Sequence, residues 1–190
     1  MRIISGNKKG KKILLPNQDI TRPLKDSVKE NIFNILLHSQ EFKYNFDFNN
    51  SIVFDIFAGS GSFGMECLSR GSRFCLFVEN NNSTHNILYR NLSNNFEKNK
   101  FEILKKDFFN IDFQFLIQKY NPVIIFFDPP YELENIDIAF DKIFKAIEKF
   151  SQIYLIAHIK KNKKLKNNNL INFQEKIYGL SKIIFMKSKN

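Results

Sequence analysis

The chain has 190 residues, an ordinary size for one domain, and hydrophobic residues make up 43% of it, enough for a sizeable core. Lys and Arg total 29 against 19 Asp and Glu, and the formal net charge of +10 favours an anionic partner such as nucleic acid. No apolar run is long enough to span a bilayer, and the basic N-terminal residues lack the apolar segment of a signal peptide, so we expect a cytoplasmic protein with no membrane partner.

The N-terminal residues form a basic segment that predicts a β-hairpin. Residues 2–5 and 12–15 are strand-like and flank the turn-rich residues 6–10. Phosphate contacts from such a hairpin would give affinity without reading the bases. A solvated, lysine-rich face is the alternative interpretation. The side chains that we expect to bind nucleic acid are Arg2, Lys8, Lys9, Lys11, Lys12 and Arg22.

A helix is predicted after this hairpin. A break at residues 21–23 is followed by apolar residues with helical spacing from residue 26 to residue 38. Either Asp26 or Ser27 can cap the helix. Residues 1–40 would therefore form a small extension that packs on the main fold.

From residue 51 onward, strands and helices alternate. Short apolar runs bounded by turn signals predict strands at residues 52–57, 74–78, 101–104, 123–127 and 153–159. Stretches with helical spacing predict helices at residues 63–70, 83–96, 113–120 and 136–150. This alternation implies right-handed crossovers and a parallel sheet that helices cover on both faces.

The C-terminal residues depart from the alternation. Residues 172–178 and 181–186 are strand-like and are separated by residues 179–180, which predicts a closing hairpin with an antiparallel strand. The predicted fold is thus α/β, a doubly wound sheet. Residues 51–190 would form its core, and the whole chain would be effectively a single domain.

A glycine-rich loop follows the first predicted strand, within residues 55–64. Glycines let the backbone turn sharply and approach a ligand closely. The spacing Gly59-x-Gly61-x-x-Gly64 also fits a dinucleotide-binding loop, and a tight turn with no ligand is a further alternative. Glu79 ends the next strand 20 residues after Gly59, where a carboxylate can accept both ribose hydroxyls of an adenosine group.

A third polar position lies after the third predicted strand. Asp107 and its neighbouring backbone amide could bind the edge of an adenine. An ordinary loop aspartate is the alternative.

The fourth predicted strand leads into Asp128-Pro129-Pro130-Tyr131, which points to methylation of a base amino group. Such an amino group is a poor nucleophile because its lone pair is delocalised into the ring. Asp128 and the Pro129 carbonyl could accept its two N–H protons, and Tyr131 could stack on a base turned out of its helix. The prolines fix φ and remove competing N–H donors. A proline-rich turn without a ligand is the alternative.

The cysteines and histidines of the chain show no pattern typical of a catalytic or metal-binding site. Cys67 and Cys75 lie in apolar or helical stretches and are expected to be reduced core thiols. They share no metal-ligand spacing with His38, His85 or His158, so no metal is expected.

Taken together, these motifs resemble the RsmD family of bacterial 16S ribosomal RNA guanine-N2 methyltransferases, nearly end to end. The matching segments are residues 1–6, 10–13, 21–23, Asp26, Val28, Glu30, 33–34, 55–64, 68–71, 77–79 and 128–131. The glycine loop and the Asp-Pro-Pro-Tyr motif are shared by many amino-methyltransferases, whereas the N-terminal segments narrow the resemblance to this family.

The resemblance implies a Rossmann-like S-adenosylmethionine-dependent methyltransferase with a seven-stranded sheet whose last strand is antiparallel. It implies methylation of a guanine of 16S rRNA in the small ribosomal subunit. No dimer interface is evident in the sequence, so we expect a monomer. The cofactor would be bound by Asp55, Phe57, Ala58, Gly59, Gly61, Glu79, Asn80, Asp107 and Phe108. The target base would be held by Asp128, Pro129 and Tyr131.

Three positions depart from the pattern that the resemblance implies. Lys9 and Lys29 stand where an arginine is expected, which keeps the charge but loses the planar guanidinium fork. His158, near the end of the fifth predicted strand, stands where a carboxylate is expected.

Three other functions compete with this one. DNA adenine-N6 methyltransferases use the same acceptor motif, but they usually carry a further target-recognition region, and none is visible here. A nicotinamide-dependent dehydrogenase would explain the glycine loop but not residues 128–131. A non-catalytic RNA-binding or ribosome-assembly module would not need Asp55, Glu79 and Asp128 intact.

Overall fold

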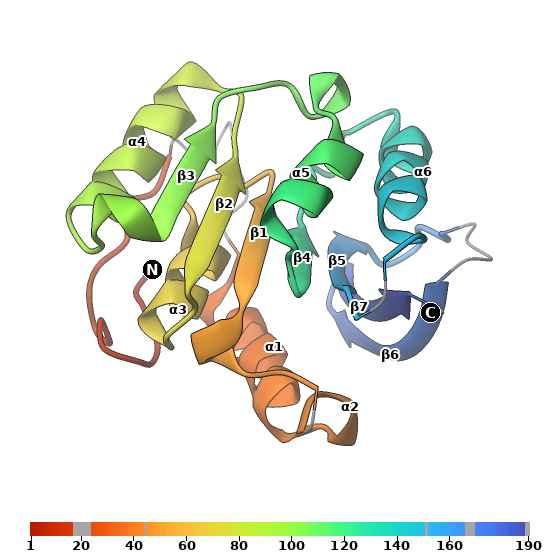
Figure 1. The fold of residues 1–190 in the computed structure, drawn as a ribbon, viewed down its shortest axis with the longest axis horizontal. Coiled ribbons are helices and arrows are strands. Elements are labelled where there is room, and N and C mark those ends of the chain that lie inside the picture. Colours follow the sequence, from red (N-terminus) through yellow and green to blue (C-terminus); the bar gives the residue numbers. More distant parts are fainter. Residues whose placement is uncertain (17–23, 44, 151, 166–169, 189–190) are drawn as a thin grey trace.

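A sheet of seven strands forms the middle layer of the computed structural model, which describes residues 1–16, 24–43, 45–150, 152–165 and 170–188 (Figure 1). The strands are β1 (Ile52–Ile56), β2 (Phe74–Val78), β3 (Phe101–Leu104), β4 (Ile124–Phe127), β5 (Tyr154–Lys160), β6 (Leu170–Tyr178) and β7 (Ser181–Ser188). Their order is β3-β2-β1-β4-β5-β7-β6. The first five are parallel, whereas β7 is antiparallel to both β5 and β6. The predicted α/β sheet with its antiparallel closing strand is confirmed.

Helices cover both faces of the sheet, as predicted. They are α1 (Asp26–His38), α2 (Gln40–Lys43), α3 (Ser62–Ser69), α4 (Asn82–Ser93), α5 (Phe113–Tyr120) and α6 (Ile136–Ile147). Short 3₁₀ turns accompany them at Phe48–Asn50, Lys98–Lys100 and Phe108–Asn110. Within the described ranges, no helix is both long and apolar enough to cross a membrane.

Two hydrophobic clusters, one on each face, hold these layers together. Alternate residues of a strand point to opposite faces, so Val53 joins the cluster beneath α1 to α4 and Phe54 joins the cluster beneath α5 and α6. The central strands are therefore mostly buried on both faces, as in β4, where every residue is buried, whereas most residues of the edge strand β6 are exposed or half-buried.

The predicted start of α1 is correct, but its predicted cap is wrong. The residue before the helix is Lys25, and no side chain caps the helix. The Asp26 carboxylate instead lies 3.5 Å from the ammonium of Lys29, one turn further along the helix. The Asp26 carboxylate, which the sequence suggested as a helix cap, therefore forms an ion pair instead.

The predicted N-terminal hairpin is present, although its strands are short. Arg2 and Lys12 form an antiparallel bridge, and Ile3 donates its N–H to Lys11 at 3.0 Å. The turn sits against the C-terminal end of α3: Gly6 has a φ of +81°, and a Cβ at this position would overlap the carbonyl of Ser69. Thr21, Arg22 and Pro23, where an interruption between the hairpin and the helix was predicted, lie outside the described residues.

Candidate active site

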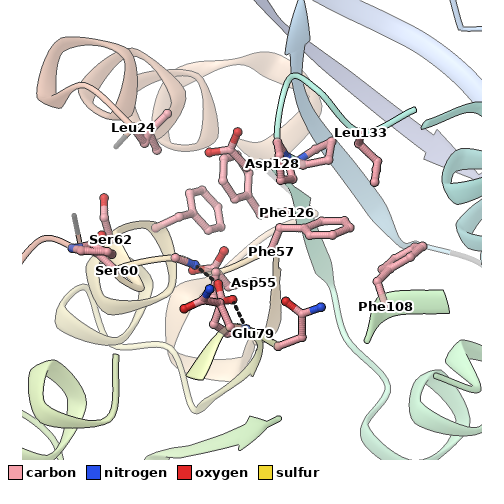
Figure 2. A pocket seen from close by; sticks show the side chains of 18 of the residues that line it. Leu24, Asp55, Phe57, Ser60, Ser62, Glu79, Phe108, Phe126, Asp128 and Leu133 are labelled. Carbon is pink, nitrogen blue, oxygen red and sulfur yellow. Dashed lines mark hydrogen bonds between the residues drawn. The ribbon is translucent and has the colours of Figure 1, made fainter. Parts of the chain in front are cut away.

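A pocket of about 520 Å³ opens at the carboxyl ends of β1, β2 and β4 (Figure 2). Parallel sheets of this kind bind their ligands at this edge. The predicted site residues that line it are Asp55, Phe57, Ala58, Gly59, Glu79, Asn80, Asp107, Phe108, Asp128, Pro129 and Tyr131. Gly61 is not among them. With that exception, the geometry brings the predicted cofactor residues and the predicted base-binding residues together around one cavity.

The glycine loop connects β1 to α3 and forms one wall. Its path begins with Phe57, whose φ of +60° is unusual for a residue with a side chain. Gly61 has a φ of +78° and immediately precedes α3, and a Cβ there would overlap the side chain of Leu88. Gly61 is thus favoured first by its left-handed backbone conformation and second by the packing of the loop against α4, behind the pocket wall.

Asp55 lies near the end of β1, beneath this loop. Its Oδ2 accepts the N–H of Gly64 at 2.9 Å, and the residue is only 2% exposed. Burial raises the pKa of Asp55 well above its usual range, and the nearby carboxylates of Asp128 and Glu79 raise it further, while the Gly64 hydrogen bond opposes them. The buried carboxyl stabilises the start of α3.

Glu79 lies just after β2, facing the glycine loop. Its Oε2 accepts the N–H of Gly59 at 3.0 Å, and its Oε1 accepts the N–H of Asn81 at 2.9 Å. Burial raises the pKa of Glu79, and the backbone hydrogen bonds counter part of that rise. A carboxylate oxygen can accept more than one hydrogen bond, so Glu79 retains capacity for a hydroxyl-bearing ligand.

Asp107 caps the 3₁₀ turn that follows β3. It is exposed, and its Oδ1 accepts the N–H of Phe109 at 2.7 Å. The ring of the next residue, Phe108, stacks on Phe57 with centroids 5.0 Å apart. This turn contributes a flat apolar wall to the pocket.

Asp128 follows β4 on the opposite side of the pocket. Its side chain is 20% exposed, and its Oδ1 lies 2.9 Å from Nδ1 of His158 on β5. The ring of Tyr131 lies 6.2 Å from the His158 ring, centroid to centroid. The Nζ of Lys160 lies 5.7 Å from the centre of the Tyr131 ring.

The pocket is acidic although the chain carries a net charge of +10. Among the described lining residues, no lysine, arginine or histidine is present. The ionisable side chains there are all carboxylic acids, namely Asp55, Glu79, Asp107, Asp128 and Glu132. This charge favours a cationic ligand and disfavours a phosphate.

Sequence reasoning missed several residues of the pocket wall. Ser62 is 4% exposed, and its Oγ has no hydrogen-bond partner in the described part of the chain. Pro16 and Leu24 reach the pocket from the N-terminal extension. Ser62 could have been predicted to line the pocket, since it is the first residue of the helix after the glycine loop. Nothing in the sequence indicates that Pro16 or Leu24 lies beside that loop.

The structure does not bring the basic hairpin to the pocket. The N–H of Lys8 donates to Oγ of Ser69 at 3.0 Å, at the last residue of α3, whereas Ser62 at the first residue lines the pocket. The tip of the hairpin is therefore roughly 10 Å from the pocket along the helix. The exposed basic residues are Arg2, Lys9, Lys11 and Lys12, whereas Lys8 is half-buried and Arg22 lies outside the described residues.

A buried carboxylate anchors the hairpin to the core. Glu66 of α3 is fully buried and accepts the N–H groups of Ile4 at 2.7 Å and Ser5 at 2.9 Å. It also accepts Nε of Arg70 at 2.9 Å. Lys29, also fully buried, donates to the carbonyl of Arg2 at 2.8 Å. Burial lowers the pKa of Lys29, and Glu66, 4.0 Å away, counters part of that effect.

Asn91 of α4 joins the end of the hairpin to the glycine loop. Its Oδ1 accepts the N–H of Leu14, and its Nδ2 donates to the carbonyls of Leu14 and Ser60, each at 2.9 Å. One buried amide therefore connects the N-terminal extension with a residue of the pocket wall.

Comparison with known proteins places the whole chain in one group. A family model described as Conserved hypothetical protein 95 matches residues 1–187. Ribosomal RNA small subunit methyltransferase D of Haemophilus influenzae is 33% identical over 69% of this chain, and the protein of the same name from Buchnera aphidicola is 34% identical over 80%. A candidate rRNA methyltransferase of Bacillus subtilis, YlbH, is 44% identical over 42% of the chain.

These alignments span different shares of the relatives. They cover 39% of the B. subtilis protein, 64% of the H. influenzae protein and 75% of the B. aphidicola protein.

Solved structures share the fold over nearly the whole chain. A candidate methylase of H. influenzae superposes with a TM-score of 0.72 and 26% identity, covering 98% of this chain and 97% of that one. An RNA methyltransferase of Salinibacter ruber, solved in complex with S-adenosyl-L-homocysteine, has a TM-score of 0.65 at 8% identity and covers 89% of this chain and 95% of that one.

Proposed function

The chain belongs to the family described as Conserved hypothetical protein 95, the RsmD family that its motifs resemble, and from this premise we propose that it is an S-adenosylmethionine-dependent rRNA methyltransferase. Its substrate is the exocyclic N2 amino group of a guanine in 16S rRNA of the small ribosomal subunit. The observation that carries the proposal is the shared acidic pocket, in which Glu79 and Asp128 face one cavity from opposite sides (Figure 2).

The pocket fits S-adenosylmethionine in charge and in polar groups. Its charged side chains, within the described residues, are all acidic, and the sulfonium group of this cofactor is a cation. Glu79 presents a carboxylate to the ribose hydroxyls beside Gly59. The stacked rings of Phe57 and Phe108 provide an apolar wall for the adenine.

The same charge argues against a nicotinamide dinucleotide. A pyrophosphate carries negative charge and is usually held by backbone N–H groups at a helix N-terminus. Here the loop amide of Gly59 is bonded to Glu79, and the amide of Gly64 is bonded to Asp55. A pyrophosphate would meet these carboxylates with no compensating lysine or arginine among the described lining residues.

Asp128 and Pro129 would orient the target amino group. The bound cofactor would supply a methyl group activated on sulfonium sulfur. Transfer would form an N–C bond, break the C–S bond with its electron pair passing to sulfur, and release one amino proton to solvent. The Asp128 carboxylate accepts one N–H of the amino group, and the Pro129 carbonyl accepts the other. The amino nitrogen gains positive character as its new bond forms, so these acceptors bind the transition state more tightly than the ground state.

The proposal is tested by methyl transfer in vitro followed by nucleoside analysis. Small ribosomal subunits and free 16S rRNA are isolated from cells that lack this gene and are incubated with the purified protein and labelled S-adenosylmethionine. Mass spectrometry of the digested RNA should detect N2-methylguanosine, at one site, only in the presence of the protein. The Asp128→Ala variant is the matched control and, at incubation times that are short compared with its slowed reaction, should give no signal above background.

Other outcomes would contradict this assignment. N6-methyladenosine in the digest, or labelling of DNA in place of rRNA, would identify an adenine methyltransferase. Absence of cofactor binding at millimolar S-adenosylmethionine would favour a non-catalytic module.

A further inference from the structure

A buried histidine supports the carboxylate that the proposed function assigns to the base. His158 is 1% exposed and lies on β5, next to β4 in the sheet. The parallel register pairs Phe127 with Ala157, so Asp128 and His158 are the next residues along the two adjacent segments. Their side chains meet with Nδ1 of His158 2.9 Å from Oδ1 of Asp128.

The identity of the two groups fixes the direction of this hydrogen bond. An ionised carboxylate only accepts hydrogen bonds, so the proton must be on Nδ1 of His158. A neutral histidine carries one ring proton, and the partner of the ring decides which nitrogen holds it. Asp128 therefore selects the Nδ1-protonated form.

The arrangement also limits the freedom of Asp128. A carboxylate at a loop start can rotate, and its side chain here is 20% exposed toward the pocket. The imidazole is held in the sheet and contacts Tyr131 as well, with ring centroids 6.2 Å apart. One histidine thus touches both side chains that are proposed to hold the target base.

We propose that His158 is a positioning residue, which donates Nδ1–H to Oδ1 of Asp128 and thereby holds Oδ2 toward the target amino group. This inference rests on the proposed function and adds a residue to it. His158 does not contact the reacting atoms itself. Misplacement of a reacting partner by about 1 Å can cost on the order of 100-fold in rate, so the loss of this hydrogen bond should be visible in the chemical step.

Two substitutions of similar shape separate the hydrogen bond from the packing. In His158→Asn, the side-chain NH₂ can take the place of Nδ1–H, whereas His158→Leu has the same branching with no donor. We expect His158→Leu to lower the single-turnover rate of methyl transfer to small-subunit RNA roughly 10- to 100-fold, and His158→Asn to retain most of the rate. Cofactor dissociation constants should be unchanged in both. His38→Leu, at an exposed position at the end of α1, is the control and should match the wild type.

The proton position gives a second test that does not depend on activity. In wild-type protein labelled with ¹⁵N-histidine, the His158 ring should carry its proton on Nδ1, and Asp128→Ala should shift that signal. His158→Asn assigns the resonance among the three histidines of the chain.

The outcomes separate this inference from the proposed function. An unprotonated Nδ1 in His158, or a signal unchanged by Asp128→Ala, would overturn the inference whatever the activity. Equal transfer rates in the Leu and Asn variants would also overturn it. If wild-type protein transfers no methyl group to small-subunit RNA, the proposed function fails, and the ¹⁵N signal still decides whether His158 holds Asp128.

Discussion

The two ends of α3 lie in regions of opposite charge. At its first residue, Ser62, the helix meets a pocket whose charged lining side chains, among the described residues, are all acidic. At its last residue, Ser69, it meets a hairpin whose exposed charged side chains are all basic. The sign of the net charge of +10 therefore agrees with the hairpin but not with the pocket.

This difference suggests a division between chemistry and affinity. An acidic pocket admits a cationic cofactor and an uncharged base but repels the phosphates of RNA, which must bind elsewhere. The hairpin is a suitable place because Glu66 and Asn91 fix it to the same core that carries the pocket. The following predictions test this division, from the largest expected effect to the smallest.

Glu66→Leu should have the largest effect, because it removes the buried carboxylate that joins the hairpin to α3. The substitution leaves the N–H groups of Ile4 and Ser5 without their acceptor and removes one of the two carboxylates near the buried ammonium of Lys29. We expect the free energy of unfolding to fall by about 3–5 kcal/mol, measured by urea denaturation. Glu30→Leu, at an exposed position on α1, is the control. Equal losses in the two variants would mean that the Glu66 contacts contribute little.

Asp128→Ala should slow methyl transfer by about 10²–10³ in single-turnover rate, because one preorganised acceptor is removed. Cofactor affinity and the free energy of unfolding should hardly change. Asp128→Asn should fall between the wild type and Ala, since its amide oxygen still accepts one hydrogen bond. A transfer rate near wild type in the Ala variant would exclude Asp128 from the chemistry.

Glu79→Ala should weaken cofactor binding by about 1.5–3 kcal/mol, the typical cost of losing a charged hydrogen-bond acceptor. RNA affinity should stay the same. Calorimetry with S-adenosylmethionine measures the first quantity, and an unchanged dissociation constant would remove Glu79 from the cofactor site.

The pH dependence of cofactor binding provides a further check on Glu79. Burial raises the pKa of this carboxyl, and binding to ribose hydroxyls favours the ionised form. Affinity should therefore be constant above the raised pKa and decline as the pH falls through it, at a higher pH than for an ordinary glutamate. Glu79→Gln should reduce this decline, and an identical pH profile in that variant would assign the decline to another group.

The hairpin lysines should have the smallest effect, which is confined to RNA binding. Replacing Lys9 and Lys11 with Ala should flatten the dependence of log affinity on log salt by up to about 0.9 for each phosphate of duplex RNA that is no longer neutralised, and by less on single strands. The matched control replaces Lys145 and Lys149, two exposed lysines at the end of α6 and just after it, on the other face of the sheet. The same slope in both double variants would make the hairpin a solvated face.

The fold could be predicted from the sequence wherever the pattern is local. The limits of β2 and α5 match the predicted ranges, because each is an apolar pattern bounded by turn residues. Seven strands and the antiparallel closing hairpin were also predictable. The short helix α2 was missed, since four residues are too few to establish a helical period.

The candidate site was predictable where a motif lies on one strand end, and unpredictable where elements meet. Asp128 and His158 are 30 residues apart, and their contact depends on the register of β4 against β5. The tip of the hairpin lies at the opposite end of α3 from the pocket, where Glu66 and Ser69 bind the hairpin, and Glu66 is a single acid in a helix with no distinguishing pattern.

The most direct test of the division between pocket and hairpin is the single-turnover rate of methyl transfer, measured as a function of RNA concentration. For Asp128→Ala, the account predicts a plateau lowered by about 10²–10³ with an unchanged half-saturating concentration. For the Lys9 and Lys11 double variant, it predicts an unchanged plateau that is reached at higher RNA concentration. If both variants change the same parameter, the pocket and the hairpin do not divide chemistry from affinity, and the account is wrong.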